Sequence, residues 1–229
     1  MILNYLISKI RREEYRIDPT VSNSFVWYSI FDRMNMLTRG ILKHPLKSRS
    51  SRIFLGQGSQ ILGSGNLEIK GAVTLQRGAI LNCFSTGKCS IGANFKLGRN
   101  STVVATTVLS QVGKGFEIGD NVGFNDFCYV GAQGGIRIGS DTIFGPYSAI
   151  FSEDHDFLGE FSTMRLNAAR RRSVTIGSNC WVGAGVTILA GTEIGDNVIL
   201  AAGAIAKGNI PSNSLVTGYN QLRSNYVEC

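Results

Sequence analysis

The chain is poor in proline, tryptophan and histidine, with four, two and two among its 229 residues. It has no apolar stretch long enough to span a membrane as a helix. The apolar run that opens the chain is interrupted by Lys9, Arg11 and Arg12, too early for a secretory signal. We therefore expect the chain to remain in the cytoplasm.

Cysteine is present but follows no pattern. There is no CxxC pair and no even number of cysteines from which to build a disulfide framework. The five positions are Cys83, Cys89, Cys128, Cys180 and Cys229. The sequence therefore indicates neither a disulfide scaffold nor a metal centre, and it is typical of a reducing compartment.

A six-residue repeat runs without interruption through residues 176–211. Each unit has an aliphatic residue, a small or turn residue, two variable residues, a small or branched residue and one more variable residue. The first positions are Ile176, Val182, Ile188, Ile194, Leu200 and Ala206, and the fifth are Cys180, Val186, Thr192, Val198, Ala204 and Ile210. A period of six matches neither an α-helix nor a simple alternating strand, so the repeat indicates a solenoid.

Such a chain must turn a corner every six residues. Glycine, asparagine and aspartate are frequent at the intervening positions, and these residues suit the left-handed conformations of tight corners. Successive coils would pair edge to edge about 4.8 Å apart and bury their aliphatic positions in a narrow prism. Cys128 and Cys180 fall on inward positions of the repeat, so we expect both to behave as small buried hydrophobes.

The repeat resembles that of the hexapeptide-repeat acyltransferases, whose fold is a left-handed parallel β-helix. The matching segments are IGDNVGFNDFCYVGAQGGIRIGSDTIFGPYSAIFSEDHDF at residues 118–157, IGSNCWVGAGVTILAGTEIGDNVILAAGAIAKGNIP at residues 176–211, and weaker coils from about Leu67. The resemblance is strongest to the sugar and polysaccharide O-acetyltransferases. It predicts a mainly-β chain with a basic helical segment at 1–52, a β-helix at 53–215 and a tail at 216–229.

The resemblance also implies a function. It implies an acetyl-CoA-dependent O-acetyltransferase that acts on a sugar hydroxyl of a bacterial surface polysaccharide or its precursor. Acetyl-CoA would be a co-substrate, and the enzyme would be a homotrimer with active sites between its subunits. No metal is implied, and two histidines are too few for the three-histidine site of a β-helix carbonic anhydrase.

The repeat is broken once. The next secure first position after Ile150 is Ile176, so a segment of about residues 152–173 must loop out of the coil. This segment contains His155, and the only other histidine, His44, precedes Pro45 in a basic linker. The family places its catalytic histidine at such a point. His155 is therefore the predicted general base, which takes the proton of the attacking hydroxyl and returns a proton to the departing thiolate.

The acids beside His155, which are Glu153, Asp154 and Asp156, are candidates to orient the imidazole. The sequence does not choose between them, and each could equally be a solvated loop acid. The chain has no G-x-S-x-G motif, so direct transfer is expected rather than an acyl-enzyme.

Further site residues are implied by the family alone. Asn125 matches a position that binds the acceptor sugar, and Trp181 matches a position that lines the acyl-donor channel. Small residues of the late coils would contact the pantetheine arm of coenzyme A, and cations would hold its phosphates. The implied cofactor-binding residues are Ala184, Gly185, Ala202, Gly203, Lys207 and Arg223. The run Arg170, Arg171 and Arg172 is either a further anion site or a solvated loop.

Residues 1–52 do not follow the repeat. They contain ten basic and four acidic residues, a net +6 of the formal +7 of the whole chain. Helices are expected at residues 2–12 and 22–42, the second with a large apolar face. That face would pack on the first coils or on a neighbouring subunit, or it would lie on an anionic membrane surface. No recognised nucleic-acid-binding motif is present, so no nucleic-acid partner is expected.

Other functions remain open at this point. A transferase that acetylates a nucleotide-linked amino sugar on nitrogen is the main alternative, and an acyltransferase that uses acyl carrier protein is a lesser one. A non-catalytic β-helix scaffold would also carry the repeat, because the repeat specifies a fold and not a reaction.

Overall fold

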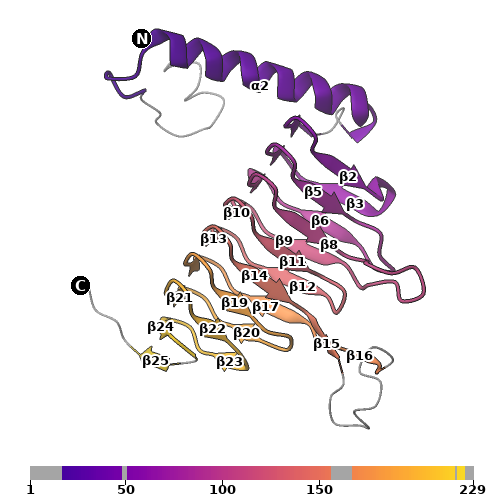
Figure 1. Cartoon of the computed structure of the whole chain (residues 1–229), viewed down its shortest axis with the longest axis vertical. Coiled ribbons are helices and arrows are strands. Elements are labelled where there is room, and N and C mark those ends of the chain that lie inside the picture. The colour runs from indigo at the N-terminus through magenta and orange to yellow at the C-terminus, as the bar shows by residue number, and fades with distance from the viewer. Residues whose placement is uncertain (1–16, 48–50, 156–166, 220, 225–229) are drawn as a thin grey trace.

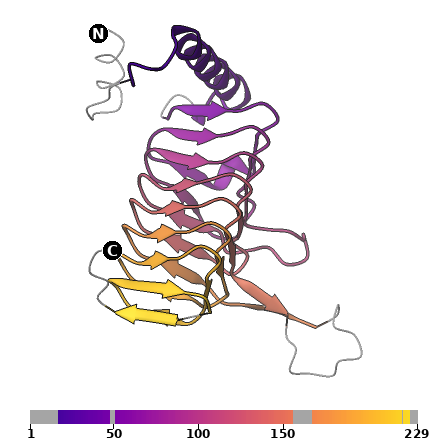
Figure 2. The same ribbon diagram turned by 60° about the vertical axis from the view of Figure 1, so that its left-hand side comes forward.

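The computed structural model describes residues 17–47, 51–155, 167–219 and 221–224, with side chains up to residue 219. Figure 1 shows a stack of short strands with one long helix, α2 (Asn23–Lys43), across its N-terminal end. Figure 2 shows the coils of the stack from a second side, with β24 and β25 at the opposite end.

Three sheets form the walls of the stack. Sheet 1 contains β1 (Ile53–Leu55), β4 (Val73–Leu75), β7 (Phe95–Leu97), β10 (Gly123–Phe124), β13 (Ile143–Phe144), β18 (Trp181–Val182), β21 (Ile199–Leu200), β24 (Ser214–Thr217) and β25 (Gln221–Ser224). Sheet 2 contains β2 (Gln60–Leu62), β5 (Ile80–Asn82), β8 (Thr102–Val104), β11 (Tyr129–Gly131), β14 (Ala149–Phe151), β19 (Thr187–Ile188) and β22 (Ile205–Ala206). Sheet 3 contains β3 (Leu67–Ile69), β6 (Cys89–Ile91), β9 (Phe116–Ile118), β12 (Ile136–Ile138), β17 (Val174–Ile176), β20 (Glu193–Ile194) and β23 (Asn209–Ile210).

Strands of successive coils pair in parallel, and the chain visits the three sheets in turn. Ile143, for example, pairs with Gly123 of the coil before and with Trp181 of the coil after. The short 3-10 helix η2 (Ser64–Asn66) joins β2 to β3 in the first coil. The predicted fold class, a mainly-β parallel β-helix with an N-terminal helical segment, is confirmed.

The interior is filled by the aliphatic positions of the repeat and by a column of phenylalanines. The rings of Phe124 and Phe144 stack with centroids 4.2 Å apart, and Phe95 meets Phe124 edge to face at 6.1 Å. Cys128 and Cys180 are buried as predicted, and burial raises the pKa of both thiols. They are therefore packing residues.

Corners repeat from coil to coil because their residues share one backbone conformation. Between sheets 3 and 1, Asn179, Asn197 and Asn213 have φ of 56°, 57° and 60°. Their side-chain amides form a ladder, in which each Nδ2 donates to the next Oδ1 at 2.9 and 3.1 Å. Asparagine therefore tolerates the left-handed corner and also ties neighbouring coils together.

The two edges of sheet 2 differ. We call the connections from sheet 1 to sheet 2 edge 1–2, and those from sheet 2 to sheet 3 edge 2–3. Every connection at edge 1–2 has four residues: 56–59, 76–79, 98–101, 125–128, 145–148, 183–186 and 201–204. The connections at edge 2–3 vary in length: 63–66, 83–88, 105–115, 132–135, 152–173, 189–192 and 207–208. The connection 105–115 and the described part of 152–173 project from the same side of the stack in Figures 1 and 2.

Helix α2 confirms the helix expected at residues 22–42. The Ser22 hydroxyl caps it by accepting from the backbone N–H of Phe25 at 3.3 Å. Its buried face, around Met36 and Gly40, lies on β1, so packing on the first coil is also confirmed. A Cβ on Gly40 would approach the Ile53 carbonyl oxygen to 1.8 Å, so only glycine fits there.

The helix expected at residues 2–12 lies outside the described residues. Among the helices that the structure describes, none combines the length and the apolar character needed to cross a bilayer.

Candidate active site

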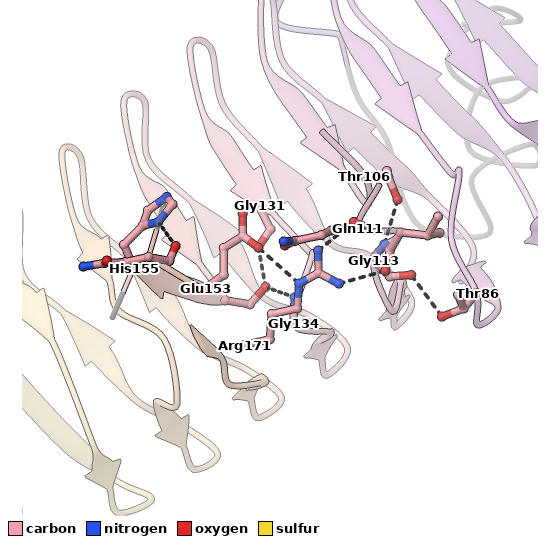
Figure 3. A network of polar contacts seen from close by, with 12 residues as sticks. Thr86, Thr106, Gln111, Gly113, Gly131, Gly134, Glu153, His155 and Arg171 are labelled. Carbon is pink, nitrogen blue, oxygen red and sulfur yellow. Dashed lines mark hydrogen bonds and ion pairs between the residues drawn. The ribbon is translucent and has the colours of Figure 1, made fainter. Parts of the chain in front are cut away.

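His155 lies on a two-stranded hairpin at edge 2–3. Strand β15 (Glu153–His155) pairs antiparallel with β16 (Ala169–Arg171), and His155 stands opposite Ala169. The side chain is exposed, and its Nδ1 atom lies 3.2 Å from the backbone carbonyl oxygen of Asn167 (Figure 3). The pairing of β15 with β16 therefore forms a hairpin that presents an imidazole to the outside.

The acids beside His155 contact arginines of the opposite strand or just after it. Glu153 forms an ion pair with Arg171 at 3.3 Å, and Asp154 forms one with Arg172. The contact described for the imidazole is the Asn167 carbonyl, so the orienting role of Glu153 and Asp154 stays a prediction. Asp156 lies outside the described residues. Two of the three arginines thus hold the hairpin together instead of forming a free anion site.

Arg171 also braces the hairpin against the other long connection of edge 2–3. Its guanidinium donates to the carbonyl oxygens of Gln111 and Val112 at 2.7 and 2.8 Å (Figure 3). That connection is itself tied to the coil before it, because the Thr86 hydroxyl donates to the Gly113 carbonyl oxygen at 3.1 Å. No sequence pattern predicted this bracing. The run Arg170, Arg171 and Arg172 was the only related feature of the sequence.

Ser152 fixes the point where the hairpin leaves the coil. Its hydroxyl is fully buried, donates to the Gly131 carbonyl at 2.6 Å and accepts from the Gly134 N–H at 2.8 Å. The backbone of Arg172 returns to the same place, donating to the Ser152 carbonyl at 2.9 Å. Both ends of the excursion are therefore anchored to one turn of the prism.

Most of the predicted substrate and donor positions share edge 1–2. Connection 125–128 carries Asn125, and, beyond connection 145–148, the next two carry Ala184 and Gly185, then Ala202 and Gly203; all five residues are exposed. Trp181, just before this edge on β18, is 54% exposed on the outer face of sheet 1. The structure thus brings these residues into one row along the prism.

The glycines of this row leave room outside the chain. Gly185 and Gly203 have φ of 66° and 73°, and a Cβ on either would meet no atom within 4 Å. By contrast, a Cβ on Gly183 would lie 2.6 Å from the Ala202 nitrogen, so that glycine serves the packing of the coils. A ligand could therefore approach the backbone closely at residues 184–185 and 202–203.

His155 and Lys207 lie on the other edge of the same sheet. Lys207 is exposed in the connection between β22 and β23, at edge 2–3. A three-residue strand of sheet 2 spans roughly 10 Å, so the two edges do not meet within one chain. The backbone of Arg223 lies on β25 opposite Leu215, and its side chain is outside the described part. The predicted site is thus divided into two halves.

The described residues contain no group of three or more His, Cys, Asp or Glu side chains that could hold a metal ion. The chemistry available at the hairpin is that of an exposed imidazole next to two ion pairs. An imidazole can act as a general acid or base.

Known proteins share the repeat and the fold. Residues 173–208 match the family described as bacterial transferase hexapeptide (six repeats). WbbJ of Escherichia coli K12, named for O-acetyl transfer in lipopolysaccharide biosynthesis, is 29% identical over 136 residues, which cover 55% of this chain and 68% of WbbJ. A galactoside O-acetyltransferase of Lactococcus lactis is 32% identical over 83 residues, 36% of this chain and 39% of that protein. The match thus spans well under half of this second relative.

Among solved structures, a mutant of AntD, an N-acyltransferase from Bacillus cereus in complex with dTDP-4-amino-4,6-dideoxyglucose and coenzyme A, has a TM-score of 0.53. It is 13% identical, and the match covers 81% of this chain and 90% of AntD. At that identity the likeness concerns the fold alone. In its hexapeptide repeat and its parallel β-helix, the chain is similar to the hexapeptide-repeat acyltransferases.

Proposed function

We propose that the protein is an acetyl-CoA-dependent O-acetyltransferase that acts on a sugar hydroxyl of a bacterial surface polysaccharide or its precursor. The observation that carries this proposal is the pair of half-sites on the edges of sheet 2. Edge 2–3 presents a histidine on a braced hairpin, and edge 1–2 presents a row of small exposed residues next to Asn125. The relatives named for lipopolysaccharide and galactoside O-acetylation favour a sugar acceptor.

The contact of His155 with the Asn167 carbonyl favours one tautomer. A carbonyl only accepts, so Nδ1 carries the proton when the imidazole is neutral, and Nε2 keeps a lone pair. Nε2 is then the base. It takes the proton of the sugar hydroxyl as that oxygen attacks the thioester carbonyl, the C–O bond forms, the C–S bond breaks, and the proton passes to the thiolate.

Closing the site requires a second copy of the chain. Because the half-sites lie on opposite edges of sheet 2, a neighbour that sets its edge 2–3 against edge 1–2 of this chain would bring His155 to Asn125 and Gly185. In a cyclic assembly each subunit gives one edge and receives the other, and every site is completed. A homotrimer, as the family implies, satisfies this requirement.

Coenzyme A would lie along edge 1–2. Its pantetheine arm would contact the backbone at Ala184, Gly185, Ala202 and Gly203, with Trp181 beside it. Lys207 of the neighbouring subunit and Arg223 are the proposed partners of the nucleotide phosphates.

The reaction type is tested by the product. Acetyl transfer from acetyl-CoA is measured with glycosides that carry only hydroxyl groups and with nucleotide-linked amino sugars, and each product is treated with mild alkali. We expect an alkali-labile ester formed from the glycosides. A stable amide formed only from the amino sugars would instead support the N-acetyltransferase. No transfer to any acceptor, together with no binding of coenzyme A, would support a scaffold.

We also infer that helix α2 rests on an anionic membrane surface. Its face opposite β1 carries large exposed apolar side chains, and the surrounding segment 1–52 has a net charge of +6. The exposed apolar and aromatic residues on and beside this face are Trp27, Tyr28, Phe31, Met34, Ile41 and Leu42. An enzyme held there would meet lipid-linked glycan precursors on the cytoplasmic side.

Vesicle co-sedimentation tests this contact. The full chain is compared with a triple variant, Trp27→Ser, Phe31→Ser and Met34→Ser, on vesicles with and without anionic lipid. We expect the triple variant to lose binding and a Ser24→Ala, Thr38→Ala control on the same helix to keep it. Equal behaviour of all three proteins, or a change of oligomeric mass in the triple variant, would contradict the membrane contact and favour burial against another subunit.

A further inference from the structure

Two residues at edge 1–2 have a backbone conformation that is unfavourable for their side chains. The left-handed corner residue is glycine or asparagine in five of the seven connections: Gly58, Gly78, Asn100, Gly185 and Gly203. In the other two it is Phe127 and Tyr147, each with φ of 61°. A bulky aromatic residue in this region is a genuine outlier, whereas glycine or asparagine adopts it readily. Strain of this kind is concentrated at functional sites.

The two side chains form one flat surface. Their rings are stacked with centroids 5.1 Å apart and an angle of 5° between the ring planes. Phe127 is 47% exposed and Tyr147 is 65% exposed, so the stack stands on the surface and does not fill the core. Pro146 restricts the backbone immediately before Tyr147. The pair is therefore a rigid aromatic platform supported by two adjacent coils.

The platform ends the row of small residues. Along edge 1–2 the corner residues run from Gly203 to Gly185, which leave open space outside the chain, and then to Tyr147 and Phe127. Asn125 lies two residues before Phe127 in the same connection. Between them, the Asp126 carboxylate accepts the Arg99 backbone N–H at 2.7 Å. Polar groups thus border an apolar surface at the end of the proposed donor track.

We propose that Phe127 and Tyr147 bind the acceptor by stacking against the C–H face of a pyranose ring. An aromatic surface matches that apolar face, while the sugar hydroxyls at its rim would meet the Asn125 amide and the Asp126 carboxylate. The carboxylate disfavours an acidic sugar at this position, so the ligand is a neutral pyranoside. This inference rests on the proposed function and names the group that holds its acceptor.

The test compares acceptor binding with acetyl transfer. The probes are methyl β-galactopyranoside and a neutral galacto-oligosaccharide, and the proteins are the wild type, the double variant Phe127→Asn, Tyr147→Asn, and the conservative variant Phe127→Tyr, Tyr147→Phe. Binding without acetyl-CoA is followed by saturation-transfer NMR from protein aromatic protons. Transfer is followed by coenzyme A release. Thermal melting and oligomeric mass are measured for each protein.

We expect the asparagine variant to lose the saturation-transfer signal and to raise the acceptor KM at least about tenfold, with the KM for acetyl-CoA within about twofold. Its melting temperature should not fall, because asparagine suits both corners. The conservative variant should behave as the wild type. Platform-dependent binding without acetyl transfer would support the platform and contradict the proposed reaction.

Three results would overturn the platform. These are transfer by the asparagine variant with an unchanged acceptor KM, no sugar signal from the wild type, and loss of activity accompanied by a change in oligomeric mass. The last result would show that the aromatic pair contacts a second copy of the chain.

Discussion

The two edges of sheet 2 flank the same strands but differ in their connections. Every connection at edge 1–2 has four residues, whereas the length of the connections at edge 2–3 varies, from the shortest at residues 207–208 to the longest at residues 152–173. The constant edge offers a regular row of backbone and small side chains, which suits an extended ligand. The variable edge carries insertions that the coil itself does not need. In the proposed site, edge 1–2 binds coenzyme A and edge 2–3 supplies the general base.

The largest expected effect is at the variable edge. Replacing His155 by alanine removes the proposed base, and we expect acetyl transfer to fall by about 10²–10⁴-fold. The matched control is His44→Ala, since His44 is the only other histidine and follows α2 at the N-terminal end of the stack, away from the hairpin of β15 and β16 (Figure 1). Steady-state coenzyme A release measures both. Equal activity of the two variants would remove His155 from the mechanism.

The next effect concerns the constant edge. Ala184→Phe should fill the open surface beside Gly185 and raise the KM for acetyl-CoA by about tenfold, about 1.4 kcal/mol of lost binding. Gln57 occupies the same corner position in the first coil, so Gln57→Phe tests the same change away from the track. Calorimetric titration with coenzyme A distinguishes them. Similar affinities for both variants would mean that the donor does not follow edge 1–2.

A third effect, on stability and with a smaller loss of activity, should link the two insertions of edge 2–3. Arg171→Leu removes the ion pair with Glu153 and the bonds to the Gln111 and Val112 carbonyls, which we expect to lower the free energy of unfolding by about 2 kcal/mol. Acetyl transfer should also decrease, because the hairpin loses its brace. Arg170→Leu, on the exposed position of the same strand, is the control, and thermal melting with activity is the measurement. Indistinguishable variants would show that the brace is dispensable.

The smallest expected effect is at Asn125. Losing one neutral hydrogen bond to the acceptor costs about 1 kcal/mol, so Asn125→Ala should raise the acceptor KM by about fivefold and leave the KM for acetyl-CoA unchanged. Gln76→Ala, at the same corner position two coils earlier, should change neither constant. A rise in the acetyl-CoA KM instead would move Asn125 from the acceptor side to the donor side.

The repeat predicted much of the fold because the first and fifth positions of each unit must point inward. Cys128 and Cys180 are buried for this reason, and the break after Ile150 marks where the hairpin leaves the coil. The helix at α2 followed from its cap and apolar face. The second insertion, residues 105–115, was not predicted, since the earlier coils follow the repeat too weakly for one irregular connection to stand out.

The sequence by itself therefore determined the prism, its buried residues and the histidine that leaves it, because these depend on local periodicity and its failure. The tertiary structure alone decided that Asn125 and the small residues 184–185 and 202–203 share one edge while His155 and Lys207 share another. It also decided that Glu153 and Asp154 face arginines, and that Phe127 stacks on Tyr147. These relations join residues that are distant along the chain, and only the stacking of complete coils brings them together.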